Sequence, residues 1–154
     1  MLGRIYETQD CSAARALEIV GERWSLLIIR DALFLGLTRF GDFQRRLGLA
    51  RNVLAARLDR FVEEGLMTRR PDAAGSAYHE YVLTPKGREL QPVVIALTHW
   101  GDRWAAPSDP PVTFRHRGEC AGEVHLETVC EHCGNHPAPD EVEADPRALR
   151  TSTT

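Results

Sequence analysis

Apolar residues recur at helical spacing through the middle of the chain, and a glycine divides them into two series. The two series are Phe40, Phe43 and Leu47, then Leu54, Leu58, Phe61 and Val62. Gly48 interrupts the pattern, and Gly65 suits the left-handed position that follows a helix. A short helix near 39–47, a tight turn and a longer helix near 51–64 together make a helix-turn-helix.

The face of the second helix opposite its apolar series is small and polar near its beginning. With about 100° between successive residues, this face carries Asn52, Ala55, Ala56, Asp59 and Arg60. A helix of this kind fits the major groove of double-stranded DNA. Asn52 and Arg51 are the residues that we expect to contact base edges, since Asn pairs well with adenine and Arg with guanine.

Two further helices are expected before this motif. The first covers residues 12–20, with Ser12 as a good N-cap and a narrow apolar face that ends at Gly21. The second covers residues 22–35 and is closed by Gly36. Its middle is apolar on all sides, which predicts a central, buried helix.

Two β-like runs follow the helix-turn-helix, Met67 to Arg70 and Tyr78 to Leu83. Turn-forming residues separate the runs, so the sequence predicts a hairpin over 67–83. These turn residues are Pro71, Asp72, Gly75 and Ser76. A hairpin directly after a recognition helix is a wing, and Arg69 and Arg70 at its base are expected to contact phosphates. The alternative is an ordinary hairpin that contacts only solvent.

A long helix is expected from Pro85 to about Trp104, with Thr84 as its N-cap and proline at its first position. Its apolar stripe comprises Leu90, Val94, Leu97, Trp100 and Trp104. An exposed stripe of this kind usually marks a partner surface, most simply that of a two-fold dimer. The alternative is that the stripe packs on its own domain. Pro92 is expected to kink the helix or to shorten its first turn.

The net charge of −3 is unusual for a DNA-binding protein until it is divided by segment. Residues 39–70 contain eight arginines and four acidic residues, a net charge of +4. Residues 105–154 contain four arginines and nine acidic residues, a net charge of −5. The positive charge therefore belongs to the helix-turn-helix and the hairpin. The residues expected to contact DNA are Arg39, Arg45, Arg51, Asn52, Ala55, Ala56, Arg57, Arg60, Arg69 and Arg70.

Together these features resemble the HxlR family of winged-helix bacterial transcriptional regulators, which is related to the MarR-like group. The resemblance covers roughly residues 8–104 and rests on Cys11, Gly21, Trp24, Arg39-Phe40, Phe43, Leu54, Arg57-Leu58, Gly65-Leu66, Arg69, the run from Glu80 to Thr84, Gly87 and Trp100-Gly101. It implies a homodimer, built from the N-terminal and C-terminal helices, whose paired recognition helices bind a roughly palindromic operator. Ala50 departs from the family, in which a serine often caps the recognition helix.

In the family that this chain resembles, a cysteine at the place of Cys11 often senses electrophiles or oxidants. That role requires a thiolate stabilised by positive charge or by a helix N-terminus, and a helix start at Ser12 with Arg15 one turn on supplies both. A small molecule or an electrophile is then the expected effector. The alternative is a partly buried cysteine that packs as a small apolar residue.

The composition changes after Trp104, where a proline-rich linker over 105–114 leads to the other three cysteines. Residues 115–136 resemble a small zinc ribbon, because a C-x-x-C-G motif follows an H-x-x-x-C motif. The expected zinc ligands are His116, Cys120, Cys130 and Cys133, with His125, His132 and His136 as alternative ligands. Val124, Leu126 and Val129 are expected in the strands of its hairpin. A metal-free hairpin with reduced thiols is the alternative, and residues 137–154 are predicted to be a mobile acidic end.

The sequence thus predicts a mainly α member of the α+β class, with a winged helix-turn-helix and dimerisation domain over 1–104 and a small Cys/His hairpin tail. A cytoplasmic location is expected, because the chain lacks a membrane-spanning apolar run and a signal-peptide core. Enzyme activity is not expected, since no glycine-rich phosphate loop or nucleophile–base pair is present. Two functions compete. One is a sequence-specific DNA-binding regulator, most simply a repressor, and the other is a protein-interaction or redox-switch module without specific DNA binding. The salt dependence of DNA binding distinguishes them.

Overall fold

The computed structural model describes residue 6 and residues 11–71, 78–105 and 112–145. The chain divides into two compact units, Met1–Gln91 and Pro92–Thr154, which are described separately. Within the described residues, no helix is long and apolar enough to cross a membrane. The mainly helical α+β class predicted from the sequence is confirmed.

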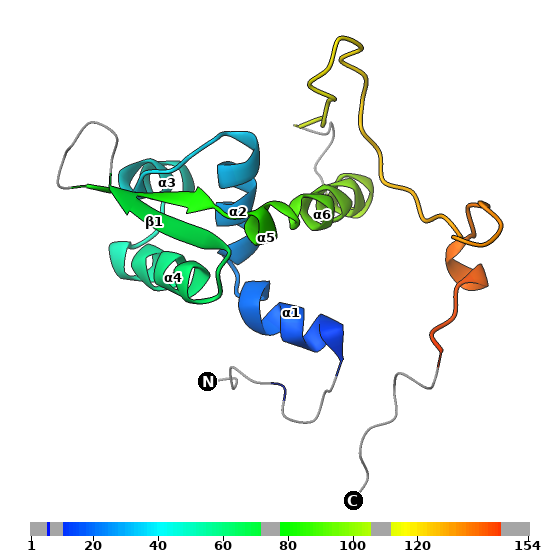
Figure 1. The fold of residues 1–154 in the computed structure, drawn as a ribbon, viewed down its shortest axis with the longest axis horizontal. Helices are drawn as coiled ribbons and strands as arrows, with labels where there is room; N and C mark the ends of the chain where they lie inside the picture. Colours follow the sequence, from blue (N-terminus) through cyan, green and yellow to red (C-terminus); the bar gives the residue numbers. More distant parts are fainter. Residues whose placement is uncertain (1–5, 7–10, 72–77, 106–111, 146–154) are drawn as a thin grey trace, which may run out of the picture. The chain divides into compact units, whose positions relative to one another are not determined.

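The first unit contains five helices and one hairpin among its described residues (Figure 1). In chain order these are α1 (Ser12–Val20), α2 (Ser25–Phe34), α3 (Phe40–Leu47), α4 (Arg51–Glu63), β1 (Met67–Pro71), β2 (His79–Leu83) and α5 (Pro85–Arg88). The apolar series recognised in the sequence forms the core, with Ile28, Ile29, Phe43, Leu54, Leu58 and Phe61 fully buried. One face of α4 is therefore inside the unit and the opposite face is directed outward.

The two N-terminal helices begin at different residues from those predicted. Cys11, rather than Ser12, is the N-cap of α1: its backbone is extended and its Sγ accepts a hydrogen bond from the Ala14 N–H at 3.4 Å. Helix α2 begins at Ser25 rather than at residue 22. Residues 22–24 form a turn instead, in which the Ser25 N–H donates to the Glu22 carbonyl at 2.9 Å.

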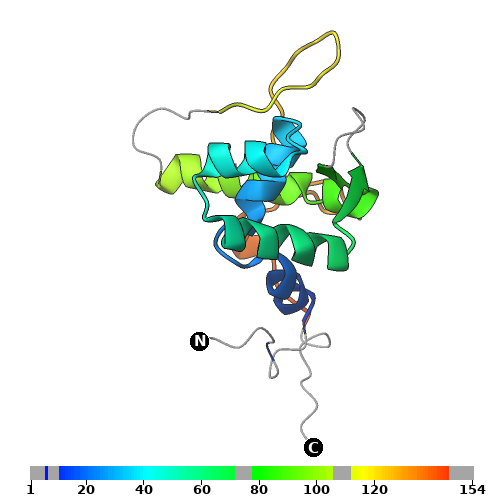
Figure 2. The same ribbon diagram turned by 90° about the vertical axis from the view of Figure 1, so that its left-hand side faces the viewer.

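Glycines before and after α4 set the path of the chain. Gly48 between α3 and α4 has φ +65°, and Gly65 after α4 has φ +69°. Residues with a Cβ rarely adopt this left-handed conformation, so both predicted turn positions are confirmed. In Figures 1 and 2, α3 and α4 lie one above the other with the β1–β2 hairpin beside them.

The hairpin after α4 has antiparallel pairing from Met67 opposite Leu83 to Pro71 opposite His79, which confirms the predicted strand pair. The predicted turn residues Asp72, Gly75 and Ser76 lie outside the described residues. The free edge of β2 is also tied to the segment before α3, where the Tyr81 N–H donates to the Thr38 carbonyl at 2.7 Å. This bond places the beginning of α3 next to the wing.

The long C-terminal helix is interrupted after its first turn. The predicted cap at its beginning is confirmed, since Thr84 Oγ1 accepts from the Gly87 N–H at 3.2 Å and Pro85 occupies the first position. Helix α5 nevertheless ends at Arg88, and α6 (Gln91–Trp104) begins three residues later. Pro92 explains the break, because a proline has no N–H to donate to the Arg88 carbonyl and its ring would clash with that carbonyl.

The second unit contains α6 and a tail with little regular structure in its described residues. A single antiparallel bridge joins Arg115 and Glu123, and a short 3₁₀ helix, η1, covers Pro139–Glu141. The predicted strands at Leu126 and Val129 are absent: residues 124–130 have no regular structure, and both side chains are exposed. The hairpin closes within residues 114–124 because its hydrogen bonds join residues 114 to 124 and 116 to 122.

We predict that Gly87→Ala destabilises the first unit. A Cβ at position 87 would lie 2.1 Å from the Leu66 carbonyl oxygen, and backbone at that position cannot move aside cheaply. The expected loss is about 1–3 kcal/mol of unfolding free energy, measured by chemical denaturation. Gly41→Ala is the control, since Gly41 is also helical but a Cβ there would meet nothing within 4 Å. Equal stability of the two variants would contradict the close contact.

Candidate nucleic-acid interface

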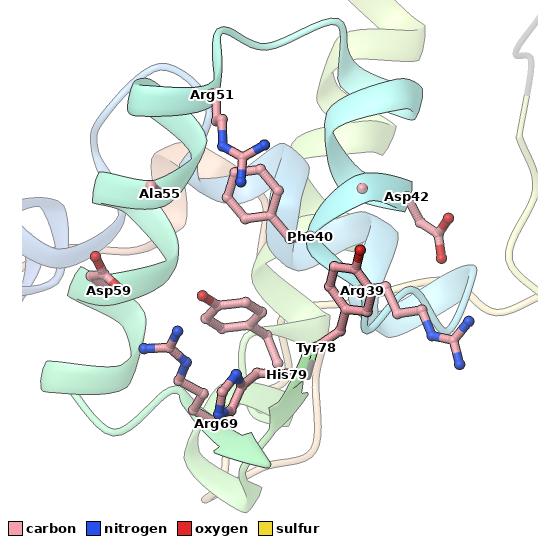
Figure 3. Close-up of a pocket in the computed structure, with 11 residues that line it drawn as sticks. Arg39, Phe40, Asp42, Arg51, Ala55, Asp59, Arg69, Tyr78 and His79 are labelled. Atoms are coloured by element: carbon pink, nitrogen blue, oxygen red, sulfur yellow. The ribbon is translucent and has the colours of Figure 1, made fainter. Parts of the chain in front are cut away.

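A groove opens between the beginning of α3, the outer face of α4 and the wing, with a volume of about 590 Å³ (Figure 3). Its lining residues are Arg39, Phe40, Gly41, Asp42, Arg51, Ala55, Asp59, Arg69, Tyr78, His79 and Tyr81. Three arginines from three separate segments thus line one groove, and the Arg39 guanidinium points away from α4 (Figure 3). Two aspartates line the same groove, so its positive charge is moderate rather than extreme.

Aromatic rings lie beneath two of these arginines. The Arg51 guanidinium carbon lies 5.4 Å from the centre of the Phe40 ring, and that of Arg69 lies 5.9 Å from the centre of the Tyr81 ring. A cation over an aromatic face is attracted by the ring quadrupole, which favours these orientations. Both guanidinium groups are held at the groove while their side chains stay exposed.

Glu80 holds the third arginine near the wing. Its Oε1 lies 3.9 Å from Arg39 Nε and accepts a hydrogen bond from Thr38 Oγ1 at 3.1 Å. Because Glu80 is on β2 and the other two residues precede α3, this contact joins two sides of the groove.

Other arginines predicted to contact DNA pair with acidic residues of their own chain. Arg57 is only 22% exposed, and its Nη2 lies 2.8 Å from Glu22 Oε2. Arg60 pairs with Glu63 and Glu64 at the end of α4, and Arg45 pairs with Asp42. A further pair links Arg46 on α3 to the buried Asp31 on α2 at 4.0 Å. These contacts brace the helices, and Arg57 in particular is positioned as part of the packing.

The beginning of α4 exposes the residues that the sequence assigned to base contacts. Arg51, Asn52 and Ala56 are exposed, and Ala55 is half-buried at the groove. Arg70 on β1 is exposed as well. The N-cap of α4 is Ala50, which provides no side-chain hydrogen bond. The first turn of this helix therefore has no side-chain acceptor from its cap.

The groove also contains four residues that were not predicted from the sequence, Phe40, Tyr78, His79 and Tyr81. A signal was available for one of them, because the hairpin register places Tyr81 directly opposite Arg69, and directly opposed residues contact each other across a strand pair. The role of Phe40 had no local signal, since it depends on how α3 packs beside α4.

Helix α6 presents large apolar side chains to its surroundings. Leu97, Trp100 and Trp104 are 53%, 61% and 70% exposed. Val94, predicted on the same stripe, is buried at 3%, and Leu90 is half-buried between α5 and α6. The stripe is thus partly packed within the chain and partly uncovered.

The four cysteines are free thiols. Arg15, expected one turn on from Cys11, donates its N–H to the Cys11 carbonyl at 3.1 Å, and its side chain pairs with Glu18 at 2.9 Å and donates to the Tyr6 carbonyl at 2.8 Å. In the tail, His116 Nδ1 lies 3.3 Å from Cys120 Sγ. Backbone hydrogen bonds from Cys133 and His132, and a side-chain hydrogen bond from Cys133, lower the pKa of the Cys130 thiol.

The described residues contain no group of three or more His, Cys, Asp or Glu side chains that could hold a metal ion. The expected set of four zinc ligands is therefore not assembled. His116 with Cys120, and Cys130 with Cys133, are two separate pairs.

Comparison with known proteins links this fold to transcriptional regulators. The family model described as HxlR-like helix-turn-helix matches residues 19–109. The HTH-type transcriptional regulator Rv3095 of Mycobacterium tuberculosis is 42% identical over 136 residues, which is 88% of this chain and 85% of that protein. The crystal structure of PA1607, a transcription factor candidate, matches with a TM-score of 0.79 at 42% identity. The match covers 88% of this chain and 94% of that chain.

A second solved structure, PA1374 from Pseudomonas aeruginosa, has a TM-score of 0.59 at 37% identity, over 88% of this chain and 93% of that one. Matched spans of this length extend beyond the winged-helix residues into the cysteine-containing tail. The relatives are transcriptional regulators, and nothing in them points to catalysis.

We predict that Arg57→Ala lowers the unfolding free energy by about 1 kcal/mol. The change removes a partly buried ion pair, which solvent screens only in part. Asn52→Ala, an exposed change on the same helix, should stay within about 0.5 kcal/mol of the parent. Chemical denaturation of the two variants measures the difference. An Arg57 variant as stable as the parent would mean that the pair with Glu22 contributes nothing to packing.

Proposed function

The chain belongs to the HxlR-like helix-turn-helix family and is a DNA-binding transcriptional regulator, and from this premise we propose that it acts in the cytoplasm as a homodimeric repressor of a palindromic operator. In this proposal α4 enters the major groove and the wing lies along the adjacent phosphate backbone. Repression follows because a dimer bound at an operator excludes other proteins from that DNA.

The lining of one groove by Arg39, Arg51 and Arg69 beside the exposed face of α4 is the observation that carries this proposal. Guanidinium groups suit phosphate oxygens and guanine edges. Asn52 on the same exposed face suits adenine. Contacts to phosphate position a protein on DNA, whereas contacts to base edges specify the sequence.

Two copies of α4 are needed to recognise a palindrome. The uncovered part of the α6 stripe, Leu97, Trp100 and Trp104, supports a second copy of this chain as the partner. In such a dimer the two recognition helices would meet half-sites about 34–36 Å apart, one turn of DNA.

The sulfur of Cys11 supports a thiol-linked effector response. Cys11 is half-buried, and its Sγ lies at the N-terminus of α1, where it accepts a hydrogen bond from the Ala14 N–H. An electrophile or oxidant that modifies this sulfur would add atoms at the place where the Ala14 N–H now donates. The same helix is part of the proposed dimer, so modification there would reach the DNA through the assembly.

We predict that Asn52→Ala weakens binding to the cognate operator by about 1–3 kcal/mol and leaves binding to random DNA nearly unchanged. Arg69→Ala, which removes a phosphate contact, should weaken binding to all sequences alike and lower the salt slope by about one. Footprinting upstream of the protein's own gene supplies the operator, and titration at several salt concentrations supplies the slopes.

Arg117→Ala is the matched control, since Arg117 is an exposed arginine of the tail and its loss should leave both affinities unchanged. Equal losses on operator and random DNA for Asn52→Ala would contradict its base-reading role. Parent protein that binds every DNA weakly and without salt dependence would favour a protein-interaction module instead.

Trp100→Glu is predicted to convert the dimer to a monomer, because it would bury a charge without a partner in an apolar contact. Analytical ultracentrifugation measures the change. Tyr78→Glu is the control, because it introduces the same charge at an exposed aromatic residue of the wing and should remain dimeric. A dimeric Trp100→Glu variant, or a monomeric parent, would exclude this interface.

A further inference from the structure

We propose that the two side-chain pairs of the tail are halves of one tetrahedral zinc site, with His116, Cys120, Cys130 and Cys133 as ligands, and that the ion draws the two halves together. This inference concerns the second unit and is independent of the proposed operator binding.

The first half is a tight turn that already holds its two donor atoms together. His116 Nδ1 lies 3.3 Å from Cys120 Sγ. The turn is fixed by hydrogen bonds from the His116 N–H to the Gly122 carbonyl at 2.9 Å and from the Ala121 N–H to the Gly118 carbonyl at 3.2 Å. The imidazole lies over Gly118, where a Cβ would be only 2.5 Å from the ring. Glycine at 118 is thus what lets the ring approach the sulfur.

The second half has the form of a zinc knuckle. The Gly134 N–H donates to the Cys130 carbonyl at 2.8 Å, and the Cys130 N–H donates to the Asn135 carbonyl at 2.9 Å. Cys130 and Cys133 have the spacing of the two thiols of a C-x-x-C-G motif, and Gly134 directly after them has φ +71°.

Both halves are followed by a residue with positive φ. Gly134, directly after Cys133, has φ +71°, and Ala121, directly after Cys120, has φ +46°. Among the described residues Ala121 is the one non-glycine with positive φ, and an alanine persists there only when the surrounding turn imposes it. Each ligand pair is therefore followed directly by a residue with positive φ.

Neither half is complete alone. Each supplies two donors, and no third ligand joins either pair within the described residues. Zinc prefers four ligands in a tetrahedron, and one nitrogen with three sulfurs is a common structural set. The two pairs together provide that set, and the thiolates favour zinc over hard cations such as magnesium.

The segment between the halves can close around an ion. Residues 121–129 separate Cys120 from Cys130 and, apart from the bridge at Glu123, have no regular structure, while Leu126 and Val129 remain exposed. Closing so short a loop costs little chain entropy. Metal binding supplies the folding free energy that so small a core cannot provide.

The test uses the full chain purified without chelator. Elemental analysis should find about one zinc per chain. After replacement by Co²⁺, the intensity of the sulfur-to-cobalt charge-transfer band should correspond to three thiolates. Cys120→Ser and Cys130→Ser should each reduce the band to the intensity of two thiolates. His116→Ala should keep the intensity of three thiolates but lower the metal affinity at least about tenfold, because mutation of residues that only hydrogen-bond to metal ligands already has an effect of that size.

Gly118→Ala tests the geometry without removing a ligand. Its Cβ would displace the His116 ring from Cys120, so metal affinity should fall as it does for His116→Ala. Gly122→Ala is the matched control, because a Cβ there would make only an ordinary contact of 3.8 Å with Cys120 Sγ and should bind metal as the parent does. His132→Ala should also leave the metal in place.

Three results would overturn the proposal. These are metal-free parent protein that takes up no cobalt, a parent cobalt spectrum with only two thiolates, and metal binding unaffected by Cys120→Ser and His116→Ala. Operator binding by the same preparations shows whether the first unit is folded, so loss of metal is distinguishable from general unfolding.

Discussion

The burial of one face of α4 is the contact on which the rest of the first unit depends. Leu54, Leu58 and Phe61 are fully buried together with Phe43 of α3, and burial of apolar area is the dominant favourable term in folding. Because these side chains must be inside, the opposite face of α4 must be outside. The exposure of Asn52 and Ala56 is thus a consequence of core packing, and the recognition surface needs no separate device to keep it accessible.

The groove beside that face depends on a second, smaller set of contacts. Thr38 joins the segment before α3 to the wing: its carbonyl accepts a hydrogen bond from the Tyr81 N–H, and its hydroxyl donates to Glu80. Thr84 then ties the end of the wing to the end of α4, since its hydroxyl donates to the Gly65 carbonyl at 2.6 Å. These contacts hold helix, wing and turn together, which fixes the spacing of the arginines that line the groove.

The helices and the hairpin were predictable because each has a local signal: apolar periodicity for α3 and α4, Thr-Pro for the start of α5 and flanking turn residues for the wing. It was not predictable which arginines line the groove and which pair with acidic residues of the same chain. Arg57 pairs with Glu22, 35 positions away, and no pattern within α4 distinguishes it from Arg51. The prediction of strands in the tail was wrong for another reason. Leu126 and Val129 carry a strand-like composition, but a strand forms only when a partner strand and a core are present, and neither exists there.

Helix α4 lacks a side-chain cap at its N-terminus. Ala50 offers no acceptor to the N–H groups of the first turn, where the helix dipole is also positive. A phosphate oxygen arriving at that end would accept those hydrogen bonds, so that DNA itself would complete the helix that reads it. Part of the binding free energy would then be spent on ordering the first turn, and the helix would fray in the absence of DNA and stiffen in its presence.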